Sequence, residues 1–157
     1  MIERIILPRH TLNLERLALT NNNIQPQNLS RFANFTNLRY LYLGVDTSEE
    51  SIARLGEGIY NRWYGTLEYL KNLECLKELF INSTDIDAGW EYLPTNELDF
   101  FIFGDCGRAE AGVNRLKEVL KIDEETAVDR EESENFWKVN IIRRMQGEWL
   151  NAVIQQN

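Results

Sequence analysis

The chain has little of what catalytic and metal sites are usually built from. Its 157 residues include one histidine and two cysteines. His10 is the only imidazole that a Ser/His/Asp or Cys/His arrangement could use, and no nucleophile can be placed beside it. Cys75 and Cys106 lack metal-ligand spacing, and no glycine-rich phosphate-binding motif occurs. We therefore expect no catalytic residue, no metal site and no cofactor.

Long apolar runs are missing too. None approaches the roughly 18 residues that a membrane-spanning helix needs. The first run, Ile5 to Leu7, stops at Pro8 and is too short for a signal peptide. Two cysteines without a disulfide framework suit a reducing compartment. The sequence therefore predicts a cytoplasmic protein that makes no membrane contact.

Positive charge is scarce and unevenly placed. The formal net charge is −8, and residues 123–134 hold seven acids against one arginine, which is −6. Only −2 is left for the rest of the chain, because −8 minus −6 is −2. A near-neutral body with one acidic segment makes nucleic acid a poor candidate partner. We interpret residues 123–134 as an acidic connector.

The chain does contain a repeated phrase. The segment from Leu14 to Asn22 has apolar residues at its first, fourth and sixth places and asparagine at its ninth. Four further segments fit the apolar part: Ile2/Ile5/Leu7, Leu38/Leu41/Leu43, Leu76/Leu79/Ile81 and Leu98/Phe101/Phe103. Because side chains alternate faces along a strand, the apolar places point inward and the residues between them face solvent. The sequence therefore predicts a stack of short strands.

This pattern, L-x-x-L-x-L-x-x-N, resembles the leucine-rich repeat family over roughly residues 1–122. The copy at Leu14 carries the whole phrase, while Asp46, Thr84 and Cys106 take the asparagine place in later copies. The resemblance implies an α/β solenoid with short parallel strands on its concave face and helices on its convex face. The pattern is similar to that of the intracellular ribonuclease-inhibitor-like and F-box-associated types of this family.

The segments between the strands predict the convex helices. Leu29, Phe32 and Phe35 follow a helical spacing, as do Ile52, Leu55 and Ile59 after Ser48, and residues 109–121 form an amphipathic pattern. Leu38 and Leu76 are 38 residues apart, so we expect an insertion between them. Residues 2–7 are expected to form a capping strand or a shortened edge.

Residues 135–157 depart from the repeats. Residues 135–156 predict one long amphipathic helix, which we interpret as a cap over the open end of the stack. Its apolar face could instead be presented to a partner's groove, or pair with a second copy to make a homodimer. The whole chain is expected to be a single structural domain.

The outward strand positions carry the functional signal. One column would hold Ile6, Ala18, Tyr42, Phe80 and Ile102, and its neighbour Arg4, Arg16, Tyr40, Glu78 and Phe100. Aromatic residues gathered on one surface are typical of an interaction site. The candidate partner-binding residues are Tyr40, Tyr42, Phe80, Phe100, Ile102, Arg16 and Glu78. The alternative is that residues 47–70 or the C-terminal helix cover this patch.

The sequence therefore favours a non-catalytic protein-protein interaction module that binds another protein through its concave face. One alternative is the substrate-recognition fragment of an F-box-type ubiquitin ligase adaptor. Another is a scaffold that supports an enzymatic or small-ligand site. A third is an extracellular receptor ectodomain, glycosylated at Asn28, Asn34 or Asn82.

Overall fold

The computed structural model describes residues 5–7, 13–120 and 134–155, with side chains in the last range from residue 142 onward. Its strands are β1 (Arg16–Ala18), β2 (Gln27–Asn28), β3 (Tyr40–Tyr42), β4 (Trp63–Thr66), β5 (Glu78–Phe80), β6 (Asp85–Ala88) and β7 (Phe100–Ile102). Its α-helices are α1 (Glu49–Gly56), α2 (Val113–Val119) and α4 (Glu134–Gln155), and its 3-10 helices are η1 (Leu29–Phe32), η2 (Leu67–Leu70) and η3 (Trp90–Tyr92).

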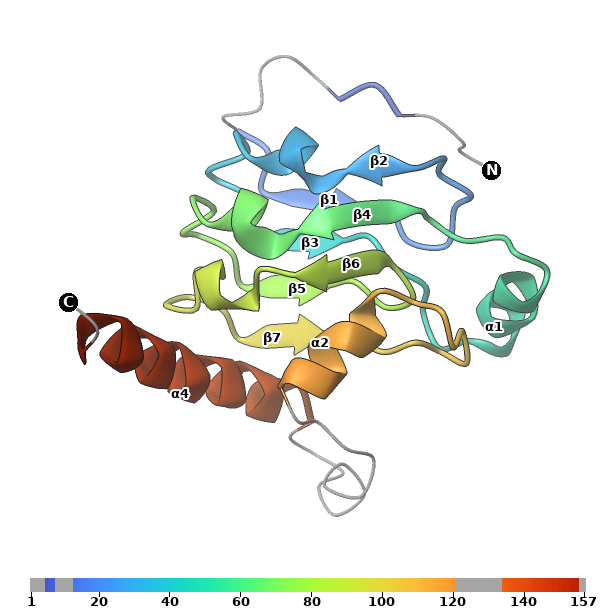
Figure 1. Ribbon diagram of the computed structural model, residues 1–157. Helices are drawn as coiled ribbons and strands as arrows, with labels where there is room; N and C mark the ends of the chain where they lie inside the picture. The colour runs from blue at the N-terminus through green and yellow to red at the C-terminus, as the bar shows by residue number, and fades with distance from the viewer. Residues whose placement is uncertain (1–4, 8–12, 121–133, 156–157) are drawn as a thin grey trace.

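The strands form two parallel sheets (Figure 1). A four-stranded sheet has the order β1-β3-β5-β7, and a three-stranded sheet has the order β2-β4-β6. Each circuit of the chain, from one strand of the four-stranded sheet to the next, adds one strand to both sheets. The protein is therefore α/β, with short parallel strands in two sheets and a C-terminal helix.

The core consists of the apolar positions that the repeated phrase predicts. The middle residues of three strands, Leu41, Leu79 and Phe101, are buried, while the residues beside them are half-buried or exposed. The flanking places of the phrase are buried as well: Leu38, Leu43, Leu76, Ile81, Leu98 and Phe103. The alternation expected for a strand with one buried face is confirmed at β3, β5 and β7.

The first convex segment is the main correction to the sequence prediction. Where α-helix was expected over Leu29 to Phe35, the chain forms the short 3-10 helix η1 directly after β2. The next two circuits repeat this arrangement with β4–η2 and β6–η3, whereas the helix expected within residues 109–121 is found as α2. The apolar residues recur every three positions, at Leu29, Phe32, Phe35 and Leu38. Hydrogen bonds from Phe35 N to Phe32 O (3.0 Å) and from Leu38 N to Phe35 O (2.9 Å) keep the same period. Three residues per turn is the geometry of 3-10 structure, so side chains spaced by three share one face.

The expected insertion is confirmed in the second circuit. Helix α1 adds the extra length between β3 and β4, and Figure 1 shows it beyond the carboxyl ends of the four-stranded sheet. Its first turn is capped by Ser48, whose hydroxyl accepts a hydrogen bond from Ser51 N at 3.3 Å. This is the N-cap arrangement that serine favours. The helix is shorter than the Ile52-to-Ile59 spacing suggested, because it ends at Gly56.

The capping strand expected over residues 2–7 is not found in its described part. Residues 5–7 belong to no strand, and residues 1–4 lie outside the described ranges. Only 12 residues separate Ile2 from Leu14, against 24 from Leu14 to Leu38, so the chain is too short there to complete a circuit. Ile5 is nevertheless buried, and its carbonyl accepts a hydrogen bond from Arg31 at 3.4 Å.

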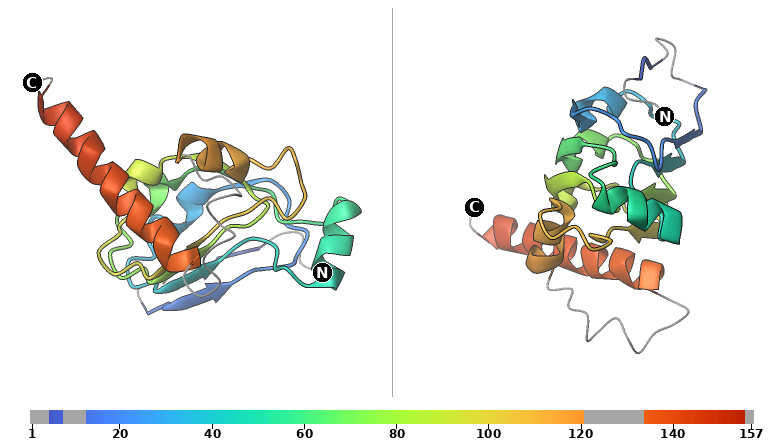
Figure 2. Two further views of the ribbon diagram at one scale, coloured as in Figure 1. Left: turned by 90° about the horizontal axis from the view of Figure 1, so that it is seen from below. Right: turned by 90° about the vertical axis from the view of Figure 1, so that its right-hand side faces the viewer.

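The C-terminal helix, predicted over 135–156, is confirmed as α4. It contacts β7 and η3, and Ile142 is buried in the core. Arg143 Nη2 donates to the carbonyls of Thr95 (2.7 Å) and Leu98 (3.0 Å). These contacts close the β7 end of the stack, while the later turns of α4 project beyond it (Figure 2).

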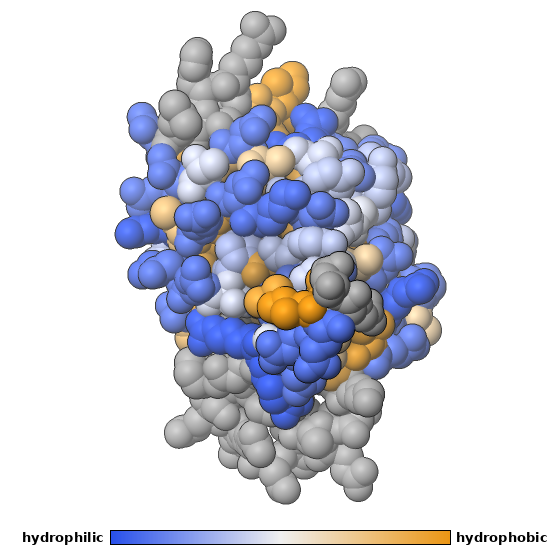
Figure 3. Space-filling model, turned by 60° about the vertical axis from the view of Figure 1, so that its left-hand side comes forward, coloured by the Kyte–Doolittle hydropathy of each residue, from blue (hydrophilic) through white to orange (hydrophobic). Residues whose placement is uncertain are grey.

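The projecting end of α4 is partly apolar. Four of its large apolar side chains are exposed: Trp149, Leu150, Val153 and Ile154. Figure 3 shows apolar side chains gathered beside this end of the helix. The Trp149 ring meets the ring of Tyr92 edge-on at 6.1 Å, which joins this end of the helix to η3. None of the described helices is long and apolar enough to cross a membrane.

Candidate functional site

The predicted outward positions lie in two rows across the four-stranded sheet. The register aligns Arg16, Tyr40, Glu78 and Phe100 in one row. The second row consists of Ala18, Tyr42, Phe80 and Ile102. All seven candidate residues therefore share one surface with Ala18, and we call these eight residues the aromatic face.

The two rows do not extend past β1 to Arg4 and Ile6, which the sequence analysis had placed in them. Arg4 lies outside the described ranges. Ile6 is 92% exposed and belongs to no strand, so it does not continue the row of Ala18 and Tyr42. The aromatic face therefore begins at β1 and ends at β7.

A network of polar contacts links the first three strands of the aromatic face. The guanidinium carbon of Arg16 lies 5.2 Å from the ring centre of Tyr40 and 5.1 Å from that of Tyr42. Arg16 Nη2 also donates to the Tyr42 hydroxyl at 3.5 Å. The same hydroxyl donates to Glu78 Oε2. On its other side, the Tyr42 ring meets Phe80 edge-on at 6.4 Å.

This network changes the acidity of the Tyr42 hydroxyl. Burial and the hydrogen bond to Glu78, together with the carboxylate's negative charge, raise the pKa of Tyr42 to about 12, while Arg16 acts in the opposite direction. The raised pKa means that folding favours the neutral phenol. This stabilisation is complete below pH 10, the ordinary tyrosine pKa, and is lost as the pH rises toward 12.

Glu78→Gln should therefore lower the pKa of Tyr42, because a neutral amide neither repels the phenolate nor accepts as strongly. NMR of ¹³C-labelled tyrosine would follow each ring during a titration. At pH 11 a tyrosine with a pKa of 12 is only about one-tenth ionised, and one with a pKa of 10 about nine-tenths. Glu74→Gln, an equal charge change at an exposed position, is the control and should leave the Tyr42 titration unchanged. A wild-type Tyr42 that titrates near 10 would contradict the network.

The described segments leave the aromatic face uncovered. Of the residues that could have covered it, Trp63 is fully buried in the core, and the guanidinium groups of Arg62 and Arg108 lie 4.6 and 4.2 Å from the ring centre of Tyr60. Helix α4 closes the β7 end of the stack instead of crossing the strands (Figure 2). Phe100 is 42% exposed as a result.

No protein-family model, curated protein or solved structure matches this chain. The aromatic face offers an exposed cation, two phenol hydroxyls and a set of apolar side chains on a sheet of short strands. Aromatic and arginine side chains are the residue types enriched where proteins bind one another.

A polar cluster beyond the carboxyl ends of β1 and β3 was not predicted from the sequence. Asn21 Nδ2 donates to Asp46 Oδ2 at 2.6 Å, and Asp46 N donates back to Asn21 Oδ1 at 3.0 Å. Hydrogen bonds from Ser48, then Ser51 and Asn21, hold the pKa of Asp46 well below its usual range. Sequence spacing could not reveal this cluster, because its members come from two different circuits.

The asparagine place of the repeated phrase has a local role. Asn22 Nδ2 donates to the carbonyls of Leu19 and Thr20, both at 3.1 Å. Thr84 does the same in its circuit, since its hydroxyl donates to the Ile81 carbonyl at 2.8 Å. The ninth place of the phrase therefore satisfies backbone carbonyls in both circuits. His10, at the same place of the first copy, lies outside the described residues.

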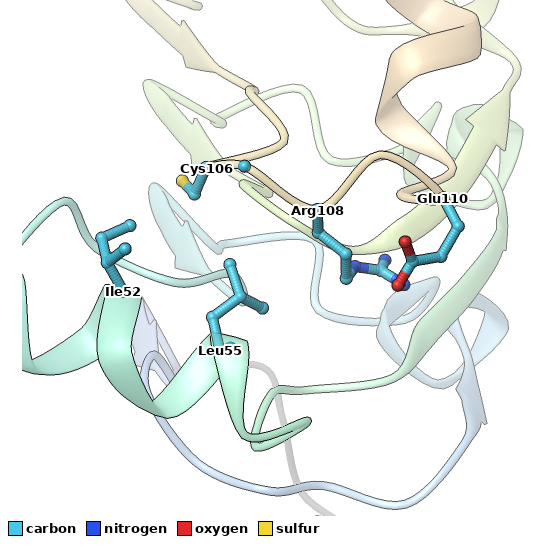
Figure 4. Close-up of a pocket in the computed structure, with 7 residues that line it drawn as sticks. Ile52, Leu55, Cys106, Arg108 and Glu110 are labelled. Carbon is cyan, nitrogen blue, oxygen red and sulfur yellow. The ribbon is translucent and has the colours of Figure 1, made fainter.

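A cavity of about 330 Å³ opens between α1 and the loop before α2 (Figure 4). Its lining residues include Ile52, Leu55, Cys106 and Arg108. The guanidinium of Arg108 binds groups of the protein itself, namely the Asp85 carboxylate (2.5 Å), the Ser83 carbonyl (3.0 Å) and the Tyr60 hydroxyl. Burial raises the pKa of the Cys106 thiol, which favours its neutral, less nucleophilic form. The Arg108 guanidinium is therefore occupied by groups of the protein itself.

The three glycosylation sequons differ in exposure. Asn82 is only 4% exposed, and the Asn28 side chain caps η1 by accepting a hydrogen bond from Ser30 N at 2.8 Å. Asn34 is exposed. A glycan at Asn82 would have to displace packed backbone, so this fold gives little support to the ectodomain alternative at that site.

Proposed function

We propose that this protein is a non-catalytic interaction module that binds another protein through the aromatic face. The observation that carries the proposal is the set of four aromatic and aliphatic side chains, Tyr42, Phe80, Phe100 and Ile102, left uncovered by the described chain beside Arg16. Buried aromatic anchors at protein interfaces each contribute about 2 kcal/mol or more. A face with several of them is suited to a macromolecular partner.

The scaffold of this module is proposed to be a leucine-rich-repeat solenoid. The support is threefold: circuits of 24 and 22 residues around a longer one, buried apolar places at the spacing of the phrase, and strands stacked in chain order. In such a scaffold the aromatic face would be the concave surface. A cytoplasmic location fits this proposal, because both described cysteines are free.

The double variant Tyr42→Ala/Phe80→Ala should lose partner capture. The tagged protein would be incubated with lysate of its source cells, and retained proteins would be quantified by mass spectrometry. We expect at least one protein to be retained about tenfold more by wild type than by the variant. Since both rings are half-buried, the variant should also lose about 2 kcal/mol of unfolding free energy while remaining folded.

The matched control is Tyr64→Ala/Tyr69→Ala, which removes two exposed aromatic rings away from the aromatic face. It should retain the same protein as wild type. Equal capture by the Tyr42→Ala/Phe80→Ala variant would place the binding surface elsewhere. Circular dichroism of all three proteins would show that loss of capture is not loss of fold.

A further inference from the structure

The aromatic face carries two charged side chains, which differ in how closely they contact their neighbours. Glu78 accepts the hydrogen bond of the Tyr42 hydroxyl. Arg16 donates a single long hydrogen bond, 3.5 Å, to that hydroxyl, and no carboxylate of the described residues lies within 4.0 Å of it. A guanidinium has five N–H donors and binds a carboxylate through two of them at once. Arg16 therefore has N–H donors available for a carboxylate of a partner.

Arg16 is also held in place for such a contact. Its guanidinium lies near the rings of both Tyr40 and Tyr42, at 5.2 and 5.1 Å from their centres. Cation–π contacts of this kind restrict a side chain that would otherwise sample many rotamers. Less conformational entropy is then lost when a partner binds, which raises affinity.

The apolar part of the aromatic face lies on the strands farther from Arg16. Phe80, Phe100 and Ile102 are on β5 and β7, whereas Arg16 is on β1. Neighbouring strands are about 4.8 Å apart, so β7 is about 14 Å from β1. An extended chain rises about 3.3 Å per residue, which places side chains four positions apart on the same side and about 13 Å from each other. The two distances match.

We infer that the aromatic face binds an extended peptide segment that crosses the strands and carries an aspartate or glutamate four positions from an apolar residue. The acidic side chain binds Arg16, and the apolar side chain packs against Phe100 and Ile102. The residue midway between them lies over Tyr42 and Phe80. This inference rests on the proposed function, since it specifies the chemistry of the partner at the same face.

The test is selection from a library of random twelve-residue peptides displayed on phage. Peptides would be selected on the wild-type protein and then depleted on the Tyr42→Ala/Phe80→Ala variant, so that only binders of the aromatic face remain. The enriched sequences should share an acidic residue and an apolar residue four positions apart. Synthetic peptides would then give dissociation constants by fluorescence anisotropy.

Three variants separate the role of Arg16 from general charge. Arg16→Gln should weaken binding of the selected peptides about tenfold, as should replacing the acidic residue of the peptide by its amide. Arg16→Lys should give an intermediate loss, because it keeps the charge but not the two-pronged geometry. Arg115→Gln, which removes an exposed cation on α2, should leave the dissociation constant unchanged.

The possible outcomes distinguish a failure of this inference from a failure of the proposed function. Selected peptides that need the aromatic face but contain no shared acidic residue, and that bind Arg16→Gln as well as wild type, would overturn this inference and leave the proposed function standing. A library that yields no peptide dependent on the face would count against the proposed function itself, and the inference would fall with it. Thermal unfolding of Arg16→Gln near the wild-type temperature shows that its loss is one of binding.

Discussion

Replacing Asn61 with leucine should lower the free energy of unfolding by about 3 kcal/mol or more. Asn61 is only 1% exposed, and its side chain binds the backbone of two circuits. Its Nδ2 donates to the carbonyls of Leu19 (2.6 Å) and Leu43 (2.8 Å), and its Oδ1 accepts from Ile24 N (3.2 Å). A buried backbone group left without a partner costs about 1–3 kcal/mol.

The expected loss of stability depends on which of the three backbone groups bound by Asn61 has a second hydrogen-bond partner. The Leu19 carbonyl also accepts from Asn22, so it stays satisfied. In the part of the chain that the structure describes, the Leu43 carbonyl and the Ile24 amide have no such alternative. Leucine has the same branched shape and number of heavy atoms as asparagine but a larger volume, so overpacking adds to the loss of hydrogen bonds at this buried site.

Urea unfolding followed by tryptophan fluorescence would measure the loss. Asn61→Asp should be no better, because a carboxylate cannot donate to the two carbonyls and would bury a charge. The control is Asn72→Ala at an exposed turn position, which should change stability by less than about 0.5 kcal/mol. A wild-type midpoint for Asn61→Leu would mean that water or another side chain serves these groups.

The contact that Asn61 makes between circuits could not be predicted from the sequence. The repeated phrase placed an asparagine at its ninth position, and there Asn22 makes contacts within its own loop. The contact between circuits comes instead from a residue in the insertion, 42 positions from Leu19 and 18 from Leu43. No period in the sequence relates these positions, because the contact depends on how far the chain returns after α1.

The aromatic face, by contrast, follows from local rules. Alternation along a strand decides which side chains point outward, and the equal spacing of the phrase decides which of them align. Both rules depend only on neighbouring residues, and the register of Tyr42 with Phe80 and Ile102 agrees with them. Whether a distant segment covers the face is a tertiary question, which the phrase could not answer.

The convex segment from Leu29 to Phe35 was mispredicted for an identifiable reason, whereas α1 and α2 form where helices were expected. Leu29, Phe32, Phe35 and Leu38 are spaced by three, as are Leu67, Leu70, Leu73 and Leu76. An α-helix has 3.6 residues per turn, so four residues spaced by three would drift around it, whereas they align in 3-10 structure. The distinction between periods of 3.0 and 3.6 was present in the sequence and predicts the short turns that the structure contains.

Gly44→Ala is the second substitution from which we expect a large loss of stability. Gly44 follows β3, where its backbone lies close to that of the next circuit. A Cβ atom at this position would come within 2.8 Å of the carbonyl carbon of Ile81, and closer still to the amide nitrogen and carbonyl oxygen of Asn82. These are backbone atoms of a sheet, so a side-chain rotation cannot relieve the clash.

The two circuits would have to separate just beyond Tyr42 and Phe80. That movement strains the hydrogen bonds from Val45 N to Asn82 O (3.0 Å) and from Asn21 N to Gly44 O (3.2 Å). Overpacking that shifts backbone typically costs about 1–3 kcal/mol, and we expect the upper end here. Urea unfolding would measure the change.

Gly56→Ala is the matched control, because a Cβ at the end of α1 has no heavy atom within 4 Å. It should leave stability unchanged or raise it by about 0.5 kcal/mol. A Gly44→Ala protein as stable as wild type would contradict the close approach of the two circuits. Since Gly44 adjoins the aromatic face, Gly44→Ala should lose partner capture together with stability. Arg16→Gln should lose affinity while keeping its unfolding temperature, so the pair separates the scaffold's contribution from that of the binding residues.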